Sequence, residues 1–323
     1  MHTLKRFVRR FMPGPEKERP EVVTEPLPSI EPGPSIELPP SFQEIYEKNC
    51  CFPPGHYYSP ITNIDEIKSM EDKVFHFFRK EVPGIDFNEE EQVQLLKAFT
   101  AYYKEMPFPE NKQEGYRYFF INDVFSYTDA IILYSFLRHF KPQRVIEVGS
   151  GYSSSLMLDT NNTFFNNSMN LTFIEPYPED RLDVLIREED RASAKIIVDK
   201  VQNVKLDVFT QLQEGDILFI DGSHVSKAGS DLNFLVFEVL PILAKGVIIH
   251  FHDIFHPLEY SREWIYEGRN WNEIYLLKAF LTYNPRFKIL FFNDFMHKYH
   301  SEGFAEMSDC YKNRGGSLWL RKL

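Results

Sequence analysis

Short apolar runs alternate with stretches of helical periodicity throughout the sequence after residue 115. Runs of β-branched and aromatic residues that predict buried strands lie at 145–148, 171–174, 196–198, 217–220, 247–251, 287–292 and 317–320. Apolar residues at helical spacing predict helices at 128–140, from Ser230 to a stop at Gly246, and from Asn270 onward with Glu273 in a capping box. Strands that alternate with helices predict an α/β fold, in which an open, mostly parallel sheet binds ligands at the carboxyl ends of its strands.

Two helices are expected before this alternating part. One runs from Ile64 to Glu81, and the other runs from Asn88, which is expected to cap it, to Tyr103. The pair Pro83–Gly84 separates them. We therefore predict three parts, which are an arm at 1–40, a helical cap region at 41–115 and a main domain at 116–323.

The arm has an unusual composition. Residues 1–12 place apolar side chains at helical spacing beside lysines and arginines, which is compatible with a weak contact to an anionic membrane or an acidic protein, or with a frayed terminus. Nine of the 21 prolines lie between Pro13 and Pro40, interleaved with glutamates. Such a segment cannot bury a core, so we expect an extended, disordered linker.

Charge and cysteine content restrict the class of protein. The net charge of −11 argues against a nucleic-acid backbone as the main partner. The chain has three cysteines, of which Cys50 and Cys51 are adjacent, so a disulfide framework is not indicated and a reducing compartment is expected. Since no run of about 18 apolar residues is present, we expect no membrane span and a cytoplasmic protein.

The sequence VIEVGSGYSS, from Val145 to Ser154, combines a buried strand with a Gly-Ser-Gly turn. Glycines let the backbone approach a ligand, and the free N–H groups of a following helix suit a carboxylate or a phosphate. Glu175 follows the second strand, where a carboxylate can accept hydrogen bonds from both hydroxyls of an adenosine ribose. NAD sites and S-adenosylmethionine sites both use such an acid, and a plain strand-to-helix turn is a third interpretation.

Four motifs in order carry a resemblance to a known family: VIEVGSGYSS, FIEPYP, DILFIDGSH and GVIIHFHDI. This series resembles class I S-adenosylmethionine-dependent methyltransferases over roughly Tyr116 to Leu323. The resemblance implies a Rossmann-like, seven-stranded sheet with an antiparallel last strand. It also implies that Glu175 holds the ribose, that Gln202 and Asn203 lie near the adenine edge, and that the methionine moiety is surrounded by Glu147, Gly149, Ser150 and Gly151.

The motif from Asp221 to His224, followed by His252 and Asp253, is similar to that of small-molecule O-methyltransferases that act on macrolide sugars. That similarity implies a magnesium ion or another divalent metal held by Asp221, His252 and Asp253, with His224 as the base and Asp221 beside the cofactor. A sugar hydroxyl is a poor nucleophile, so a cation and an imidazole would both help to remove its proton. His252 stands where the relatives have a carboxylate, and the identity of the metal stays open because magnesium prefers oxygen ligands.

Two other interpretations of this region remain. His250, His252 and His256 around Asp253 could form a transition-metal site, since imidazole suits zinc or iron. An aromatic and polar segment after the fifth strand is either a lid, an acceptor wall or ordinary helix packing; its residues are Arg262, Trp264, Trp271, Asn272 and Glu273.

We therefore predict a methyltransferase that O-methylates a sugar or another hydroxylated small molecule and does not act on nucleic acid; it could act as a homo-oligomer. A NAD-dependent oxidoreductase is the alternative enzyme, although the sequence offers neither a second nucleotide-binding half nor a tyrosine–lysine pair. A non-catalytic nucleotide-binding module is the third possibility.

Overall fold

The computed structural model describes residues 41–75 and 79–323 of the chain. The chain divides into two compact units, 1–51 and 52–323. In the first unit, helix α2 (Phe42–Asn49) begins with a capping box, in which the Glu44 amide donates to Ser41 Oγ at 3.2 Å and the Ser41 amide donates to Glu44 Oε2 at 2.5 Å. The predictions for residues 1–40, including the arm at 1–12, lie outside the described residues.

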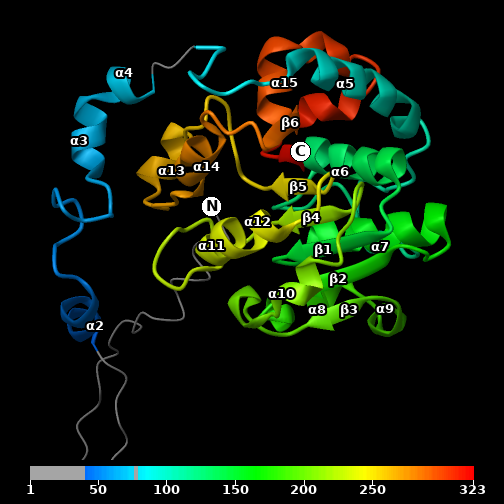
Figure 1. Cartoon of the computed structure of the whole chain (residues 1–323), viewed down its shortest axis with the longest axis horizontal. Helices are drawn as coiled ribbons and strands as arrows, with labels where there is room; N and C mark the ends of the chain where they lie inside the picture. Colours follow the sequence, from blue (N-terminus) through cyan, green and yellow to red (C-terminus); the bar gives the residue numbers. More distant parts are fainter. Residues whose placement is uncertain (1–40, 76–78) are drawn as a thin grey trace, which may run out of the picture. The chain divides into compact units, whose positions relative to one another are not determined.

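The second unit is built on a seven-stranded sheet of order β3-β2-β1-β4-β5-β7-β6 (Figure 1). The strands are β1 (Arg144–Val148), β2 (Asn170–Ile174), β3 (Lys195–Ile197), β4 (Ile217–Ile220), β5 (Ile248–Phe251), β6 (Phe287–Phe292) and β7 (Leu318–Lys322). Strands β1 to β5 pair in parallel, and β7 runs antiparallel to both β5 and β6. The predicted fold, a mostly parallel sheet with an antiparallel last strand, is confirmed.

Helices cover the sheet. The longer ones are α5 (Glu89–Tyr103), α6 (Tyr127–Phe140), α7 (Tyr152–Phe165), α14 (Glu273–Leu281) and α15 (Asn293–Tyr299). The shorter ones are α8 (Leu182–Leu185), α9 (Glu188–Ser193), α10 (Leu206–Phe209), α11 (Asp231–Phe234), α12 (Leu240–Ile242) and α13 (Arg262–Tyr266). Helix α6 packs against both α5 and α7, and α5 also contacts β6, so residues of the predicted cap region form part of the covering of the sheet.

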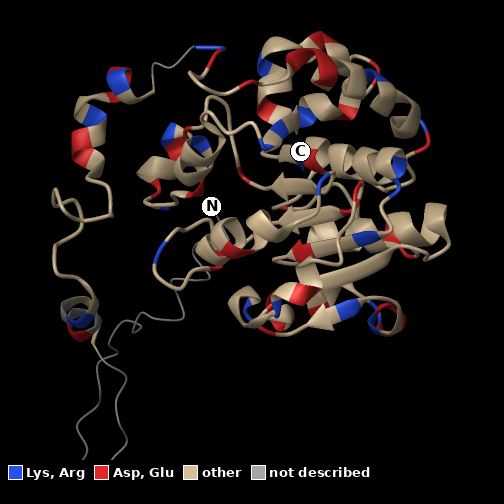
Figure 2. Cartoon of the chain, in the orientation of Figure 1, with Lys and Arg blue, Asp and Glu red and all other residues tan. Residues whose placement is uncertain are grey.

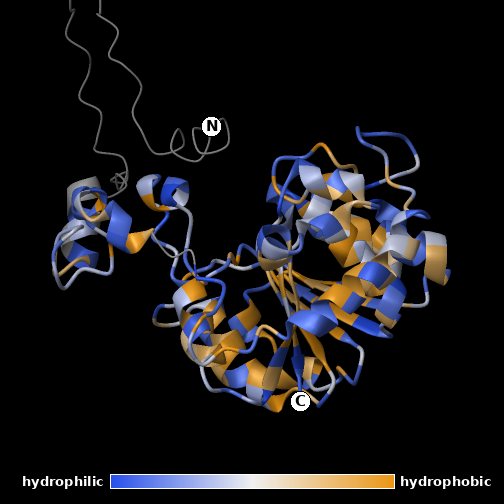
Figure 3. Cartoon of the chain, turned by 90° about the horizontal axis from the view of Figure 1, so that it is seen from above, coloured by the Kyte–Doolittle hydropathy of each residue, from blue (hydrophilic) through white to orange (hydrophobic). Residues whose placement is uncertain are grey.

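The core lies between the sheet and these helices. Hydrophobic residues gather on the strands and on the helix faces toward them (Figure 3), whereas Lys, Arg, Asp and Glu lie mostly on the outer helices and loops (Figure 2). The Trp319 indole on β7 stacks on the Phe136 ring of α6 with 3.9 Å between ring centroids, and both side chains are fully buried. Burial of large side chains of this kind contributes about 1.5–3 kcal/mol each. The sheet is thereby fixed as a rigid support for the loops at its edge.

The helix expected from Ile64 to Glu81 is wrong in length. It is two short helices, α3 (Ile64–Ser69) and α4 (Glu71–Val74), which meet at Met70. Neither buries a residue, and helices without an apolar contact face are marginal. The segment therefore lacks the packing that would extend one helix through it.

Two predicted caps and one predicted stop are also wrong. Asn88 has a φ of 51°, and its side chain bonds to Glu91 and to the Ile289 carbonyl instead of capping α5. The last helix starts at Glu273 rather than Asn270, because the Glu273 side chain is bonded to His224 and forms no capping box. Ser230 does cap α11, but the helix ends at Ile242, well before Gly246. Pro241 supplies no N–H to the preceding turn, which is π-helical (η3, Leu235–Val239).

The carboxyl ends of the parallel strands all lie at one edge, where each strand hands over to a polar loop. Gly149 follows β1, Glu175 follows β2, Asp221 follows β4 and His252 follows β5. Their amides continue the strand ladder; for example, the Asp221 amide donates to the Val148 carbonyl at 2.9 Å. Among the described residues, none of the helices has the length and apolar character needed to cross a membrane.

Candidate functional site

The turn after β1 requires glycine at its first position. Gly149 has a φ of +82°, and a Cβ there would lie 1.8 Å from the Asp221 carbonyl oxygen. No larger residue fits that approach, so Gly149 holds the turn after β1 directly against the turn after β4. Helix α7 then starts beside the turn, with the Gly151 amide donating to Ser154 Oγ at 2.9 Å.

Glu147 lies on β1 and is fully buried. The Ser153 hydroxyl donates to Glu147 Oε1 at 2.5 Å, and the Ser154 hydroxyl donates to the other oxygen. Burial raises the pKa of Glu147 to about 8 despite these hydrogen bonds. Glu147 thus ties the first turn of α7 to the strand, and its predicted place at the methionine moiety of the cofactor stays a prediction.

Glu175 links the turn after β1 to the loop after β2. Its Oε2 accepts from the Ser150 amide at 3.0 Å and its Oε1 accepts from the Tyr177 amide at 2.9 Å. Each carboxylate oxygen can accept a further hydrogen bond. The carboxylate is therefore fixed by the backbone and keeps acceptor sites for a pair of hydroxyl groups.

Glu175 lines a cavity of about 520 Å³ at the ends of β1, β2 and β4, which we call the cofactor cavity. Its other walls include Gly149, Gln202, Asp221 and Asp231. The Asp231 carboxylate, which accepts from the Ser223 amide at 2.7 Å, fixes the loop after β4. The volume of the cavity fits a nucleoside, and the Glu175 carboxylate can accept hydrogen bonds from the hydroxyls of its ribose.

The two residues predicted for the adenine edge lie differently. Gln202 lines the cofactor cavity and donates from Nε2 to the Gly229 carbonyl at 2.7 Å. The Asn203 side chain is exposed and donates to Asp199 Oδ1 at 2.7 Å, outside the residues that line the cavity. Only Gln202 is therefore placed for a contact with the base, and both assignments stay predictions.

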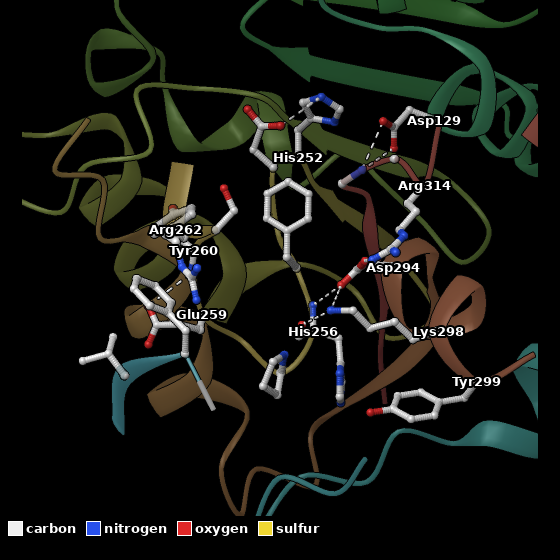
Figure 4. A pocket seen from close by; sticks show the side chains of 18 of the residues that line it. Asp129, His252, His256, Glu259, Tyr260, Arg262, Asp294, Lys298, Tyr299 and Arg314 are labelled. Carbon is white, nitrogen blue, oxygen red and sulfur yellow. Dashed lines mark hydrogen bonds and ion pairs between the residues drawn. The ribbon is translucent and has the colours of Figure 1, made fainter. Parts of the chain in front are cut away.

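A second cavity, of about 640 Å³, opens beyond β5 and is called the acceptor cavity below (Figure 4). Asp253 and His252, which directly follow β5, form part of its wall together with Tyr260 and Arg262 from the segment after them. Further parts of the wall come from α15, from the loop before β7 and from four residues nearer the N-terminus, which are Val74, Phe75, Val124 and Asp129. Segments far apart in the sequence therefore enclose this cavity.

His224 is not among the residues that line either cavity, but it lies next to one carboxylate of each. Its Nε2 is 3.5 Å from Asp221 Oδ1, which belongs to the cofactor cavity, and 3.7 Å from Asp253 Oδ2, which belongs to the acceptor cavity. Its Nδ1 is 2.7 Å from Glu273 Oε2, and its side chain is 6% exposed. The Trp271 ring lies against the imidazole with 4.4 Å between centroids. Glu273 and Trp271 thus hold the ring so that Nε2 faces both carboxylates.

The electrostatics of this group are coupled. Burial lowers the pKa of His224, but its contacts with Asp221 and Glu273 outweigh burial and raise the pKa well above the ordinary value. Burial raises the pKa of Asp221, whereas the charge of His252 and the contact with His224 lower it, with a net value of about 2. Asp221 is therefore an anion at neutral pH, and His224 is drawn toward its protonated form.

The side chains of His250, His252 and His256 do not converge on one point. The alternative of a histidine-rich transition-metal site is therefore not supported. His250 is fully buried, stacks on Phe219 with 3.7 Å between centroids and has its Nε2 3.0 Å from Ser317 Oγ. His256 bonds through Nε2 to the Lys80 carbonyl at 2.9 Å. His250 and His256 are thus occupied by structural contacts.

The predicted divalent-metal site brings its three residues together without assembling a metal-binding group. His252 Nε2 is 3.6 Å from Asp253 Oδ1. The carboxylates of Asp221 and Asp253 both lie near His224 Nε2. Within residues 41–75 and 79–323, no group of three or more His, Cys, Asp or Glu residues is arranged to hold a metal ion. Carboxylates and an imidazole are donors that can bind a divalent cation. In this structure, however, the His224 ring lies between the carboxylates of Asp221 and Asp253.

Sequence reasoning missed the role of two groups. Glu273 was considered only as a helix cap or as part of a lid, and its pairing with His224 depends on how α14 packs. Arg314 gave no signal, because it lies in a loop far from every motif. No local pattern in the sequence could have found the pairing of Glu273 with His224, since the two residues are 49 positions apart.

Comparison with known proteins gives a family match. A family model described as a methyltransferase domain matches residues 146–254, which run from β1 through the loop after β5. The chain is also 39% identical to an uncharacterized protein of Archaeoglobus fulgidus over 171 residues, which are 51% of this chain and 76% of that protein.

Solved structures with a similar course of the chain include a methyltransferase of Podospora anserina bound to SAH, with a TM-score of 0.40, 16% identity, and 79% of this chain and 96% of that chain covered. An O-methyltransferase of Bacillus cereus in complex with SAH has a TM-score of 0.37 and 12% identity, with 81% of this chain and 100% of that chain covered. We draw no functional argument from likenesses at this level.

Proposed function

We propose that the chain is a class I S-adenosylmethionine-dependent methyltransferase that transfers the methyl group to a hydroxyl of a small molecule, such as a sugar, and the match to a methyltransferase domain over residues 146–254 supports this proposal. S-adenosylmethionine would occupy the cofactor cavity, with its ribose hydroxyls on Glu175. The acceptor would enter through the acceptor cavity.

One observation carries this proposal: the position of His224 next to one carboxylate of each cavity. Its Nε2 is within 3.7 Å of a carboxylate on each side, while Glu273 holds the opposite nitrogen. Methyl transfer needs the acceptor oxygen and the methyl donor to meet in line, and it needs the hydroxyl proton to leave. A single imidazole at the junction can serve both cavities.

The proton chemistry follows from the two nitrogens of His224. With Nδ1–H donating to Glu273, the ring presents Nε2 as an acceptor for the hydroxyl proton only in its neutral form, so His224 must first lose the proton that its raised pKa favours. When bound, S-adenosylmethionine would supply the methyl group to the acceptor oxygen and leave as neutral S-adenosylhomocysteine, while His224 would take up the hydroxyl proton. Glu273 then stabilises the imidazolium, as its carboxylate already does in the buried pair.

A divalent cation belongs to the proposal as a separate part. Asp221, Asp253 and His252 would hold it, and it would polarise the acceptor hydroxyl as a Lewis acid. We expect a chelator to abolish turnover and Mg²⁺ or Mn²⁺ to restore it. Turnover that is indifferent to chelation would remove the metal and leave His224 as the sole aid to proton removal.

The proposal is tested with the full chain. Calorimetry should detect binding of S-adenosylmethionine and no binding of NAD, and a panel of hydroxylated acceptors should yield a methylated product together with S-adenosylhomocysteine. Binding of NAD alone would favour an oxidoreductase instead. Binding of S-adenosylmethionine without transfer to any acceptor would favour a non-catalytic module. A cytoplasmic location is part of the same proposal, and localisation of the tagged chain would test it.

A further inference from the structure

The acceptor cavity contains charged groups that the proposed methyl transfer does not use. Besides Asp253 at the junction, its wall includes Asp294 and Lys298 of α15 and Arg314 of the loop before β7 (Figure 4). Lysine and arginine are rarely placed in a cavity wall without an anionic partner. Among the lysines and arginines of this wall, Lys298 and Arg262 each have a carboxylate within hydrogen-bond distance, whereas the nearest one that the structure describes for Arg314 lies beyond it.

The partners of the other charges are close. Lys298 Nζ is 2.6 Å from Asp294 Oδ2, and it also donates to the His256 carbonyl at 2.5 Å. Arg262 Nε is 3.2 Å from Glu71 Oε1. The acid Asp129 accepts from the Gly316 amide at 3.0 Å and from the Ser317 hydroxyl at 2.6 Å. Lys298 and Asp129 thus have most of their hydrogen-bonding capacity occupied, and Arg262 has a carboxylate partner within hydrogen-bond distance.

Arg314 differs from them. Its nearest carboxylate oxygen within the described part of the chain is Asp294 Oδ1, at 3.8 Å, beyond hydrogen-bond distance, and Asp294 is already paired with Lys298. The Arg314 side chain is 66% exposed at the rim of the cavity. Its five N–H donors are therefore available to a ligand, and a guanidinium matches a carboxylate or a phosphate in two-point contact.

The backbone around Arg314 is fixed next to the reacting residues. The Gly316 carbonyl accepts from the Ile254 amide at 2.8 Å, and a Cβ on Gly316 would lie 3.1 Å from the Asp253 Cα. A Cβ on Gly315 would lie 2.6 Å from Asp129 Oδ1. The loop that carries Arg314 is thus packed tightly against the turn that carries Asp253, so the fold sets the position of the Arg314 backbone relative to the junction.

We propose that the acceptor carries an anionic group, a carboxylate or a phosphate, which Arg314 binds at the rim while a hydroxyl of the same molecule reaches the junction at His224 and Asp253. This inference rests on the proposed function and narrows the acceptor to hydroxylated acids and phosphorylated sugars. It makes Arg314 a residue that determines specificity.

The test uses the full chain, S-adenosylmethionine and matched acceptors: glucose against glucuronate and glucose 6-phosphate, and catechol against 3,4-dihydroxybenzoate. We expect an anionic member to be methylated with a kcat/KM at least about tenfold above that of its neutral counterpart, since a charge-assisted hydrogen bond contributes that much. The sugar pair separates carboxylate from phosphate. If the kcat/KM for a neutral acceptor equals that for its anionic counterpart, the inference is overturned.

The variants sharpen the same test. Arg314→Gln should raise KM for the anionic acceptor by about ten- to a hundredfold with kcat nearly unchanged, and Arg314→Lys should recover part of the loss. Arg286→Gln, which removes an exposed arginine outside both cavities, is the control for net charge. An unchanged KM in Arg314→Gln overturns the inference alone. Absence of methyl transfer to every acceptor by the wild-type protein overturns the proposed function, and this inference with it.

Discussion

The cofactor cavity and the acceptor cavity lie at the same sheet edge but are built in different ways. The cofactor cavity is lined by residues that directly follow β1, β2 and β4, so each part of its wall is contiguous in sequence with a strand. The second is enclosed by Val74 and Phe75, by the segment after β5, by α15 and by the loop before β7. The first wall is thus a product of the parallel sheet itself, whereas the second depends on how peripheral segments pack.

The means by which the carboxylates are held also differ. Glu175 in the cofactor cavity accepts from two backbone amides, which are fixed by the strands. Asp294 in the acceptor cavity accepts from one backbone amide, that of His256 at 2.9 Å, and is paired for the rest with the side chain of Lys298. Backbone donors cannot be removed by substitution, whereas an ion pair between side chains can be exchanged for another. We infer that the cofactor cavity tolerates little variation and that the acceptor cavity is the place where specificity can change.

The largest expected effect lies at the junction of the two cavities. Replacing His224 by Ala should lower the rate of methyl transfer by roughly 10² to 10⁴, because general base catalysis contributes that much, while the affinity for S-adenosylmethionine stays nearly intact. Single-turnover kinetics and calorimetry on the same preparation measure the two quantities.

A second variant separates this role from a structural one. His224 has a φ of 59°, a conformation that Asn adopts readily, and Asn can still hydrogen-bond to Glu273. His224→Asn should therefore keep most of the thermal stability and still lose the rate. A fully active Asn variant, or a rate loss that only follows the melting temperature, would rule out the base.

The next largest effect concerns the cofactor cavity alone. Glu175→Ala should weaken binding of S-adenosylmethionine by about 2 to 4 kcal/mol, since two hydrogen bonds to a charged group are lost and their contributions are not additive. Calorimetry measures the change. Glu188→Ala is the matched control, because that exposed carboxylate lies outside the residues that line the cavity and its loss should hardly change the affinity. Equal affinities in wild type and Glu175→Ala would refute the assignment of the ribose contact.

The smallest expected effect concerns Glu147. Here we expect a change in the stability of the fold with pH rather than a change in activity. Its pKa is about 8 in the folded protein, above the ordinary value of 4.5, so the folded state keeps a proton that the unfolded state releases. The protonated form thus contributes stability that is complete below about pH 4.5 and is lost progressively as the pH rises to about 8.

Glu147→Gln should remove this dependence, because the amide keeps the shape and hydrogen-bonding capacity without a titratable proton. The unfolding free energy of the ligand-free wild type should fall relative to that of the variant by a few kcal/mol, on the order of 1.4 per pKa unit, between these pH values. Denaturant titrations at pH 5 and pH 8 give the difference. Parallel pH profiles for the two proteins would show that Glu147 is ionised throughout.

The sequence by itself determined the sheet and the edge at which its polar loops meet. The β-branched runs fixed seven strands, with boundaries that differ from those observed by at most two residues, and the polar residues after β1, β2, β4 and β5 necessarily meet because parallel strands end at one edge. Local information suffices there, since each strand and its loop are contiguous. Local information failed for the helix expected at 64–81, where the two short helices α3 and α4 bury no residue.

Only the tertiary structure decided the contacts between distant segments. Glu273 was expected to cap its own helix, yet it pairs with His224, 49 positions earlier, because α14 packs beside the loop after β4. Arg314 joins the acceptor cavity because two glycines let its loop lie against Asp253. Such contacts depend on which faces of helices and loops are buried together, and neither hydrophobic periodicity nor spacing along the chain carries that information.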